Sequence, residues 1–313
     1  MLKNQNIKQY APVVVFAYNR PNHLRDTLEA LNKCYNAEES NIYIFCDGPK
    51  TIVTPEMIEV QKVVKEFEIK SRFNMTKSYI SEVNKGLASS VIEGVTSIIE
   101  EYGRVIVLED DLICSPNFLL FMNQALEYYC DNEQIWSISG YIFRTNLVKM
   151  IEKDVLFMGR ASSWGWATWE NRWKTIDWEV KDYNHFKYNI NKRLKFAKWG
   201  RDLPIMLDQQ VNANINSWAI RWVYEQSKQN KYSVYPVRSL IENKGADGSG
   251  EHKSNTDAFS TVMDSGDKKI FKFEEPYLEK SIEKACRKQY GFSTEVFVKV
   301  FLKNLLIRLG VIK

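Results

Sequence analysis

The chain has 313 residues, of which 44% are hydrophobic and 26% are charged, with 14 glycines and 8 prolines. This profile is typical of a globular protein and excludes disordered, collagen-like and low-complexity classes. Its 43 basic and 39 acidic residues leave a net charge of +4, which is too small to indicate a nucleic-acid partner. No apolar run approaches the roughly 20 residues of a membrane span, and the N-terminus lacks a signal-peptide core, so the sequence predicts a cytosolic protein.

The five cysteines, Cys34, Cys46, Cys114, Cys130 and Cys286, are widely spaced and include no CxxC pair. This spacing predicts reduced and mostly buried thiols. It indicates neither a zinc site nor a disulfide framework.

The first half of the chain alternates short apolar runs with helical patterns, which is typical of an α/β sheet. Strands are expected at 12–17, 41–46, 75–80, 104–108 and 135–139. Proline, or a Ser or Thr just before it, suits the start of a helix. Helices are therefore expected from Pro21 to about Cys34, from Pro55 onward, over 87–102, and from Ser115 to about Tyr129.

The second half has a different composition. The stretch 157–178 holds five of the nine tryptophans, and helical patterns follow at 183–228. A strand is expected at 232–237, and 243–257 is a loop rich in Gly, Ser and Asp. We expect a boundary near Tyr141, which divides the chain into 1–141, 142–282 and a C-terminal segment 283–313.

Three consecutive acids, Glu109, Asp110 and Asp111, follow the apolar residues 105–108. In a doubly wound α/β sheet, ligands bind beyond the carboxyl ends of the strands. Three carboxylates placed there repel one another unless a cation neutralises them, and their hard oxygens suit Mg²⁺ or Mn²⁺. We therefore predict a metal or nucleotide site. The alternative is that the acids cap the next helix, a role that Ser115 and Pro116 already fill.

Polar residues also follow the neighbouring strands. Arg20, after the first strand, suits a phosphate or a planar base, and Asp47, after the second, can accept hydrogen bonds from a base or a ribose. Lys85 precedes a helix N-terminus, where an anion would bind. The alternatives are a plain turn at Asp47 and a plain loop at Lys85. The motifs GxGxxG and GxxxxGK[ST] are absent, which argues against dinucleotide oxidoreductases and P-loop NTPases.

The remaining segments give weaker signals. Most tryptophans of 164–169 are expected in a helical core, with one or two lining a pocket. His252, in the Gly-rich loop, would complete a metal site, whereas His23 is expected to be structural. From Glu283 onward, seven basic residues stand against two acidic ones. This pattern predicts an amphipathic helix that either contacts an anionic membrane or packs on the core.

Taken together, these motifs resemble those of GT-A glycosyltransferases, in the inverting type shared by bacterial family-2-like enzymes and the N-acetylglucosaminyltransferase I family. Over 12–141 the resemblance is carried by Tyr18-Asn19-Arg20, Asp47-Gly48, Asn84-Lys85-Gly86 and Leu108-Glu109-Asp110-Asp111. Beyond 141 it is looser. It implies a GT-A, Rossmann-like mixed α/β sheet flanked by helices, with a Trp-rich acceptor-side half and a C-terminal amphipathic helix.

The resemblance also implies roles for these residues. Asp111 would bind Mn²⁺ or Mg²⁺, with Glu109 and His252 as further candidate ligands. Asp110 would contact the ribose or diphosphate of the donor. Arg20 and Asp47 would hold the nucleotide, commonly uridine, and Lys85, from its place before a helix, is a further candidate for binding the donor.

The catalytic base is the point at which this chain departs from the family. The related eukaryotic enzyme keeps an Asp in a Trp-flanked motif, but the comparable stretch from Trp218 to Trp222 has no acid. Asp208, ahead of it, is the first candidate, and Glu170 and Asp177 are alternatives.

The resemblance thus implies a metal-dependent glycosyltransferase of the hexosyl or N-acetylhexosaminyl type. It would move a sugar from a UDP-sugar such as UDP-GlcNAc to a hydroxyl of a glycan or glycolipid, with inversion, in bacterial surface polysaccharide synthesis. Region 1–141 would bind the nucleotide-sugar, region 142–282 would bind the acceptor and carry the catalytic groups, and 283–313 would contact the inner face of the membrane. Two alternatives stay open: a sugar-nucleotide nucleotidyltransferase, which would normally have a Gly-rich loop where Tyr18 to Pro21 stand, and a non-catalytic glycan-binding protein.

Overall fold

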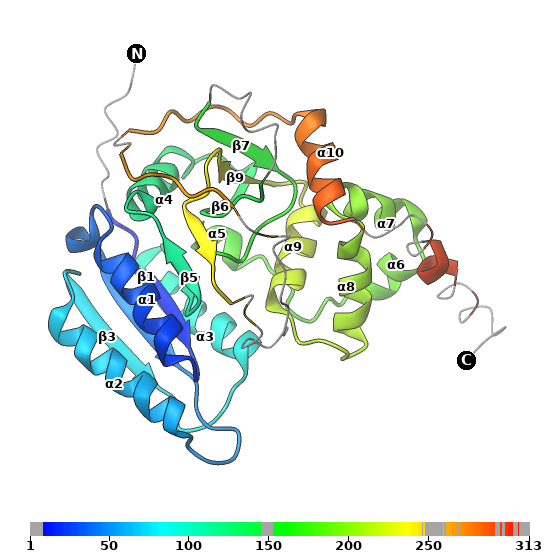
Figure 1. Cartoon of the computed structure of the whole chain (residues 1–313). Coiled ribbons are helices and arrows are strands. Elements are labelled where there is room, and N and C mark those ends of the chain that lie inside the picture. Colours follow the sequence, from blue (N-terminus) through cyan, green and yellow to red (C-terminus); the bar gives the residue numbers. More distant parts are fainter. Residues whose placement is uncertain are drawn as a thin grey trace.

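The computed structural model describes residues 9–144, 153–245, 247, 259, 261–267, 270–291, 295, 298–302 and 306. Their centre is an eight-stranded sheet in the order β3-β2-β1-β4-β8-β6-β9-β7 (Figure 1). Four of its strand pairs are parallel, while β7 and β8 run antiparallel to their neighbours. Helices cover both faces, so the predicted mixed α/β sheet flanked by helices is confirmed.

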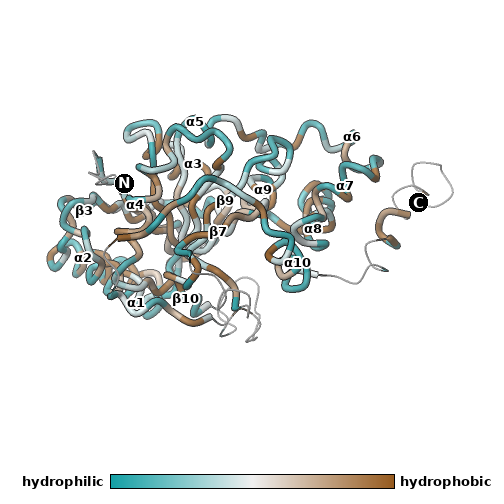
Figure 2. Tube along the Cα trace, turned by 90° about the horizontal axis from the view of Figure 1, so that it is seen from above, coloured by the Kyte–Doolittle hydropathy of each residue, from teal (hydrophilic) through white to brown (hydrophobic). Residues whose placement is uncertain are grey.

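The first four strands are β1 (Val13–Ala17), β2 (Asn41–Cys46), β3 (Met75–Ile80) and β4 (Arg104–Glu109), all parallel and all at predicted positions. Helices α1 (Pro21–Asn32) and α2 (Pro55–Lys70) lie side by side on one face, and α3 (Leu87–Tyr102) lies on the other (Figures 1 and 2). Proline begins α1 and α2, and the Thr54 hydroxyl accepts the backbone N–H of Met57 at 3.4 Å. Every residue of β1 is buried, which fits a central parallel strand.

Beyond β4 come β5 (Leu112–Cys114), α4 (Phe118–Tyr128), β6 (Ile135–Ser139) and β7 (Val155–Met158). Strand β8 (Trp166–Trp169) then inserts between β4 and β6. The helical interpretation of this Trp-rich stretch was therefore wrong: all four residues of β8 are buried in an extended strand. Helix α4 begins after Asn117, two residues later than predicted from Ser115.

The rest of the chain forms a helical layer and a second, small sheet. The helices are α5 (Glu170–Trp173), α6 (Tyr183–Lys187), α7 (Ile190–Phe196), α8 (Asp202–Val211), α9 (Trp218–Lys228) and α10 (Lys280–Gln289). Strand β9 (Tyr232–Pro236) joins the main sheet, and β10 (Ile241–Asn243) pairs antiparallel with β5. Because β5 begins three residues after the end of β4, its pairing with β10 places residues 241–243 close to the end of β4.

Tryptophans fill the core between β6, β8 and α9. Trp166 contacts Trp173, Trp218 and Trp222 with ring centroids 4.5–5.6 Å apart, and Trp136 packs against Trp222. The prediction that most tryptophans are core residues is confirmed.

The C-terminal segment is only partly described. Helix α10 buries Ile282 and Cys286 against the body of the protein. The Arg160 guanidinium donates to both carboxylate oxygens of Asp202, at 2.8 and 2.7 Å, and lies over the ring of Tyr290, the residue after α10. Several apolar and basic positions of the expected 296–313 helix lie outside the described residues. Within the described part of the chain, no helix is long and apolar enough to cross a membrane.

Candidate active site

The carboxyl ends of β1, β2 and β4 meet at one edge of the sheet. Strand β1 pairs with both others, with Phe16 level with Glu109 and Ala17 level with Cys46. The backbone N–H of Asp47 donates to the carbonyl of Ala17 at 2.9 Å. The predicted convergence of the residues that follow these strands is therefore confirmed.

Arg20 is the centre of the site. Its guanidinium forms an ion pair with Asp110 and a second one with Asp111, 2.9 Å from Nη1 to Oδ2. The two acids are 3% and 8% exposed, so this pairing takes place away from bulk water. Thr27, on the buried side of α1, donates its hydroxyl to the Asp110 carbonyl at 2.8 Å and fixes the backbone there.

The cluster carries an electrostatic cost. Burial raises the pKa of Asp110 from 3.8 to about 6; the Arg20 guanidinium pulls it down and the neighbouring Asp111 pushes it up. For Arg20, burial opposes the charge, but the two carboxylates outweigh it and raise the pKa of the guanidinium. One cation thus faces two carboxylates, and the ionised cluster has a net negative charge in a poorly solvated place.

The β5–β10 pair covers the cluster from the other side. The backbone N–H of Lys244 donates to the Asp111 carbonyl at 2.9 Å. Gly245 lies so close that a Cβ there would overlap Asp111 Oδ2 and lie 3.2 Å from Arg20 Nη1. Only a glycine fits this approach without moving the carboxylate.

The carboxylate of Asp47 accepts four hydrogen bonds from the protein itself. Its Oδ1 accepts the backbone N–H groups of Gly48 and Lys85 at 2.9 and 2.8 Å, and its Oδ2 accepts from Gly86 and the Asn84 amide at 2.9 and 3.0 Å. Four donors match the acceptor capacity of a carboxylate. Asp47 therefore holds the 84–86 loop in place.

Lys85 sits on that loop at the start of α3. Its ammonium pairs with Glu93 at 2.6 Å and is partly exposed. Gly86 precedes the helix with φ of 75°, a backbone angle that favours glycine. The loop is thus held by Asp47 on one side and leads directly into α3 on the other.

A pocket of about 640 Å³ opens along α1; Arg20, Asp110 and Asp111 do not line it, but Lys244, whose backbone N–H bonds to Asp111, does. It is lined by residues between Asn22 and Lys33 along α1, by residues 113, 114 and 116 next to β5, and by Lys244 and Asp247. Within this lining, His23 Nε2 lies 3.2 Å from Asp247 Oδ2. The volume falls within the range of small-molecule sites.

The metal prediction can be tested against these oxygen donors. Among the described residues, no group of three or more His, Cys, Asp or Glu side chains is arranged to hold a metal. Mg²⁺ and Mn²⁺ commonly take only one or two protein carboxylates and complete their shell with water and substrate phosphates. The adjacent carboxylates of Asp110 and Asp111 fit that smaller donor set. Glu109 ends β4 beside them, and His252 lies outside the described residues.

None of the three predicted bases is a free carboxylate beside the cluster. Glu170 follows β8, which runs antiparallel to β4, and its backbone N–H bonds to Gly103 at the amino end of β4. It therefore lies at the opposite end of that strand from Asp110. Its carboxylate pairs with Lys174 at 2.6 Å.

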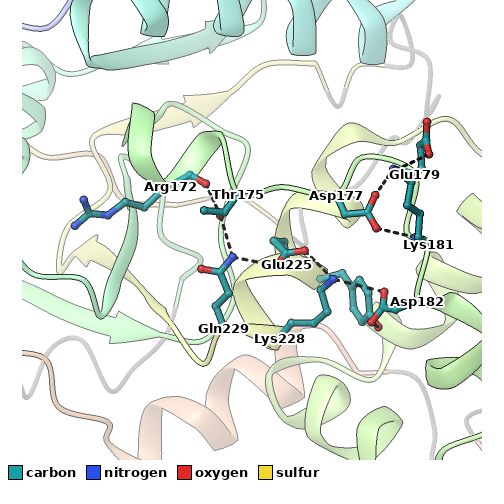
Figure 3. Close-up of polar contacts among 10 residues, drawn as sticks. Arg172, Thr175, Asp177, Glu179, Lys181, Asp182, Glu225, Lys228 and Gln229 are labelled. Carbon is teal, nitrogen blue, oxygen red and sulfur yellow. Dashed lines mark hydrogen bonds and ion pairs between the residues drawn. The ribbon is translucent and has the colours of Figure 1, made fainter.

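The other two candidates have clear structural partners. Figure 3 shows Asp177 accepting the backbone N–H groups of Glu179 and Lys181, at 3.1 and 2.7 Å, which closes the turn before α6. Asp208 is buried, and its two carboxylate oxygens each accept a hydrogen bond from the Arg193 guanidinium at 2.8 Å. The Tyr183 hydroxyl also donates to Asp208, at 3.0 Å. Asp208 thus holds α6, α7 and α8 together.

Two features of the site escaped the sequence analysis. His23 was expected to be structural, yet it lines the pocket and pairs with Asp247. Gly245 had no assigned role. The available signal was that His23 stands three residues after Arg20, in the first turn of the helix that Pro21 begins.

No protein-family model and no curated protein matches the chain. Among solved structures, the galactosyltransferase LgtC in complex with donor and acceptor sugar analogs is 10% identical with a TM-score of 0.35, covering 68% of this chain and 69% of that one. The apo-form glycosyltransferase GlyE of Streptococcus pneumoniae is 11% identical with a TM-score of 0.37, covering 72% and 45%. S. aureus TarS is 11% identical with a TM-score of 0.32, covering 50% and 28%. These likenesses are distant, and the function proposed below rests on the chain's own residues.

Proposed function

We propose that this protein is a GT-A-type glycosyltransferase that uses a nucleotide-sugar donor and a divalent cation. The observation that carries the proposal is the buried cluster of Arg20, Asp110 and Asp111 at the carboxyl ends of β1 and β4, with a 640 Å³ pocket along α1. A structural role alone would not need two adjacent buried carboxylates with one shared cation, because that arrangement costs stability.

The donor diphosphate would bind where the cluster carries its charges. Arg20 presents a planar fork of donors that suits a phosphate, and it already lies between the two carboxylates. Asp47 contributes by accepting the backbone N–H groups of Lys85 and Gly86, which would hold Lys85 near the nucleotide. We propose a uridine diphosphate donor on the resemblance described above, with a hexose or N-acetylhexosamine as the transferred group.

Asp111, together with Asp110, would hold the Mn²⁺ or Mg²⁺ ion. Such an ion supplies positive charge to the diphosphate as the sugar–phosphate bond breaks. The two protein carboxylates would orient that charge, and the Thr27 hydroxyl and the Lys244 backbone N–H fix the backbone that carries them.

We propose His23 as the group that takes the proton from the acceptor hydroxyl. It lies three residues after Arg20, lines the pocket, and is oriented by Asp247 at 3.2 Å. A carboxylate that holds one nitrogen of an imidazole leaves the other nitrogen to accept a proton from a hydroxyl. This proposal replaces Asp208, Asp177 and Glu170, each of which has a structural partner. Attack by one activated hydroxyl in a single displacement would invert the sugar.

The acceptor would be a glycan or glycolipid that reaches the cluster through the pocket. The basic C-terminal segment would keep the enzyme near an anionic membrane surface, where a lipid-linked acceptor resides. Removal of residues 296–313 should then weaken co-sedimentation with anionic vesicles. Unchanged co-sedimentation would contradict the membrane contact and leave the transferase proposal intact.

The direct test measures the unfolding temperature against UDP, GDP, dTDP and ADP, with and without Mn²⁺. A ligand that binds only the folded state raises the midpoint. We expect a Mn²⁺-dependent rise with UDP that disappears in Asp111→Asn and persists in Glu82→Gln, an exposed-carboxylate control. A rise with another nucleotide would change the donor. No rise with any nucleotide would refute the proposed function.

A further inference from the structure

Two cysteines form a close pair next to the candidate site. Cys34 lies two residues beyond α1, and Cys114 is the last residue of β5. Their sulfur atoms are 3.5 Å apart and both residues are buried. The two are 80 positions apart in the chain, so the fold alone brings them together.

The backbone around the pair fixes this contact. Tyr35 N–H donates to the Pro116 carbonyl at 2.9 Å, and the Cys34 thiol lies 3.4 Å from the Ser115 carbonyl. The end of α1 and the end of β5 are therefore already fastened at the neighbouring residues. A disulfide has an S–S length of about 2.05 Å. The two sulfurs, at 3.5 Å, must therefore move about 1.5 Å closer to form the bond.

We propose that Cys34 and Cys114 are a redox-modification site, oxidised by a hydroperoxide to a disulfide. Cys114 is 6% exposed and lines the pocket beside α1, whereas Cys34 is fully buried, so we place the first reaction with hydrogen peroxide at the Cys114 sulfur. The Cys114 sulfur attacks the peroxide O–O bond, takes one oxygen as sulfenic acid, and releases water. The Cys34 thiol then attacks that sulfur and displaces a second water. In total, two thiols and one peroxide give one disulfide and two waters.

The surroundings make the pair resistant to mild oxidants. Burial, followed by the contact with Cys34, raises the pKa of the Cys114 thiol well above its ordinary value. The thiol is therefore protonated at neutral pH, and the reactive thiolate is scarce. The dithiol should persist under reducing conditions and respond only to a sustained peroxide load.

The disulfide would join the two elements that carry the candidate site. Helix α1 begins next to Arg20, and β5 begins directly after Asp111. Because the cross-link closes a loop of about 80 residues, it restricts the unfolded chain strongly and should raise the unfolding midpoint. It adds no bulk to the Arg20–Asp110–Asp111 cluster, so nucleotide binding should be unchanged.

The test treats the full-length, reduced protein with hydrogen peroxide, blocks the remaining thiols and maps peptides by mass spectrometry without reduction. We expect one cross-linked peptide containing Cys34 and Cys114, reversal by dithiothreitol, and a midpoint higher by about 5 °C or more. Cys46 and Cys286 are the internal controls, since both are buried but neither forms the close sulfur–sulfur contact that, among the five described cysteines, joins Cys34 to Cys114, so both should remain thiols.

Single variants Cys34→Ala and Cys114→Ala should each lose the cross-link and the thermal shift. If either variant fails to fold, the peptide map of the wild-type protein still decides the matter. Recovery of both thiols, a cross-link to another cysteine, or Cys114 oxidised to the sulfinic acid with Cys34 free would each overturn the proposal. None of these results depends on nucleotide binding, so the proposed transferase function can fail separately.

Discussion

Replacing Asp110 with Asn should stabilise the protein at neutral pH while removing donor binding. In the folded state the pKa of this carboxyl is raised from 3.8 to about 6, mainly by burial. Folding therefore favours its protonated form. Above pH 6 the folded protein must keep a carboxylate ionised where neutrality is preferred, which costs about 3 kcal/mol of the free energy of unfolding.

The sign follows from proton binding. Between pH 4 and 6 the folded state holds more protons on Asp110 than the unfolded state, so this group's contribution to stability falls as pH rises. The amide introduced by Asp110→Asn cannot ionise, and Arg20 keeps its ion pair with Asp111 at 2.9 Å. The stabilisation of Asp110→Asn over wild type should then be about 3 kcal/mol at pH 7.5 and about 0.5 kcal/mol at pH 4.

The assay is urea unfolding of wild type and Asp110→Asn at pH 7.5 and pH 4. The stabilisation by the variant at pH 4 is then subtracted from its stabilisation at pH 7.5. Glu82→Gln, at an exposed acid, should change stability by less than about 0.5 kcal/mol at either pH. If Asp110→Asn were destabilising at pH 7.5, or if its effect did not depend on pH, burial would not dominate the electrostatics of the cluster.

Three further predictions concern neighbouring parts of the structure. Asp47→Ala removes the acceptor of four hydrogen bonds, one from the backbone of Gly48 and three from residues 84–86, and should lower the free energy of unfolding in urea by about 3 kcal/mol. Asp47→Asn keeps one acceptor oxygen and should recover part of that loss. Gly245→Ala should displace the Asp111 carboxylate and abolish the Mn²⁺-dependent thermal shift with UDP, with a loss of about 1–3 kcal/mol in stability; a retained shift would contradict the close approach. Arg193→Met should cost about 3–5 kcal/mol by leaving Asp208 without its cation, and Arg193→Met combined with Asp208→Leu should recover most of it; an additive loss would mean that the two side chains do not act as a pair.

The first half of the fold was predictable because its signals are local. The strands at 13–17, 41–46 and 104–109 are largely apolar runs, and Pro21 and Pro55 stand where helices begin. Parallel strands joined by helices place their carboxyl ends at one edge, so Arg20 and Asp110 could be expected to meet.

The second half was harder to predict for a physical reason. Strand β8 is buried on both faces, so it lacks the alternation of apolar and polar residues that identifies a half-exposed strand. Strands β5 and β10 have three residues each, too few to show any period. Tryptophan packs equally well in a helix or a strand, and the surrounding composition did not decide between them.

The roles of the acidic residues depended on contacts between distant segments. Asp208 meets Arg193 across two helices, and Glu170 is assigned to the far end of β4 only by the direction of β8. His23 and Asp247 are more than 200 positions apart. A sequence shows which residue types are available, but only the fold shows which of them already have a partner.

The insertion of β8 has a consequence for how the protein is made. Strands β1 to β4 emerge first, yet β4 has no neighbour on one side until Trp166–Trp169 arrive roughly 60 residues later. At about 5–20 residues per second, the nascent chain exposes an apolar sheet edge for several seconds. Such an edge readily pairs with other chains. A product that stops near Tyr141 would keep that edge exposed and should associate through it. Strands β1 to β4 are therefore protected from aggregation only after β8 has been synthesised and has paired with β4.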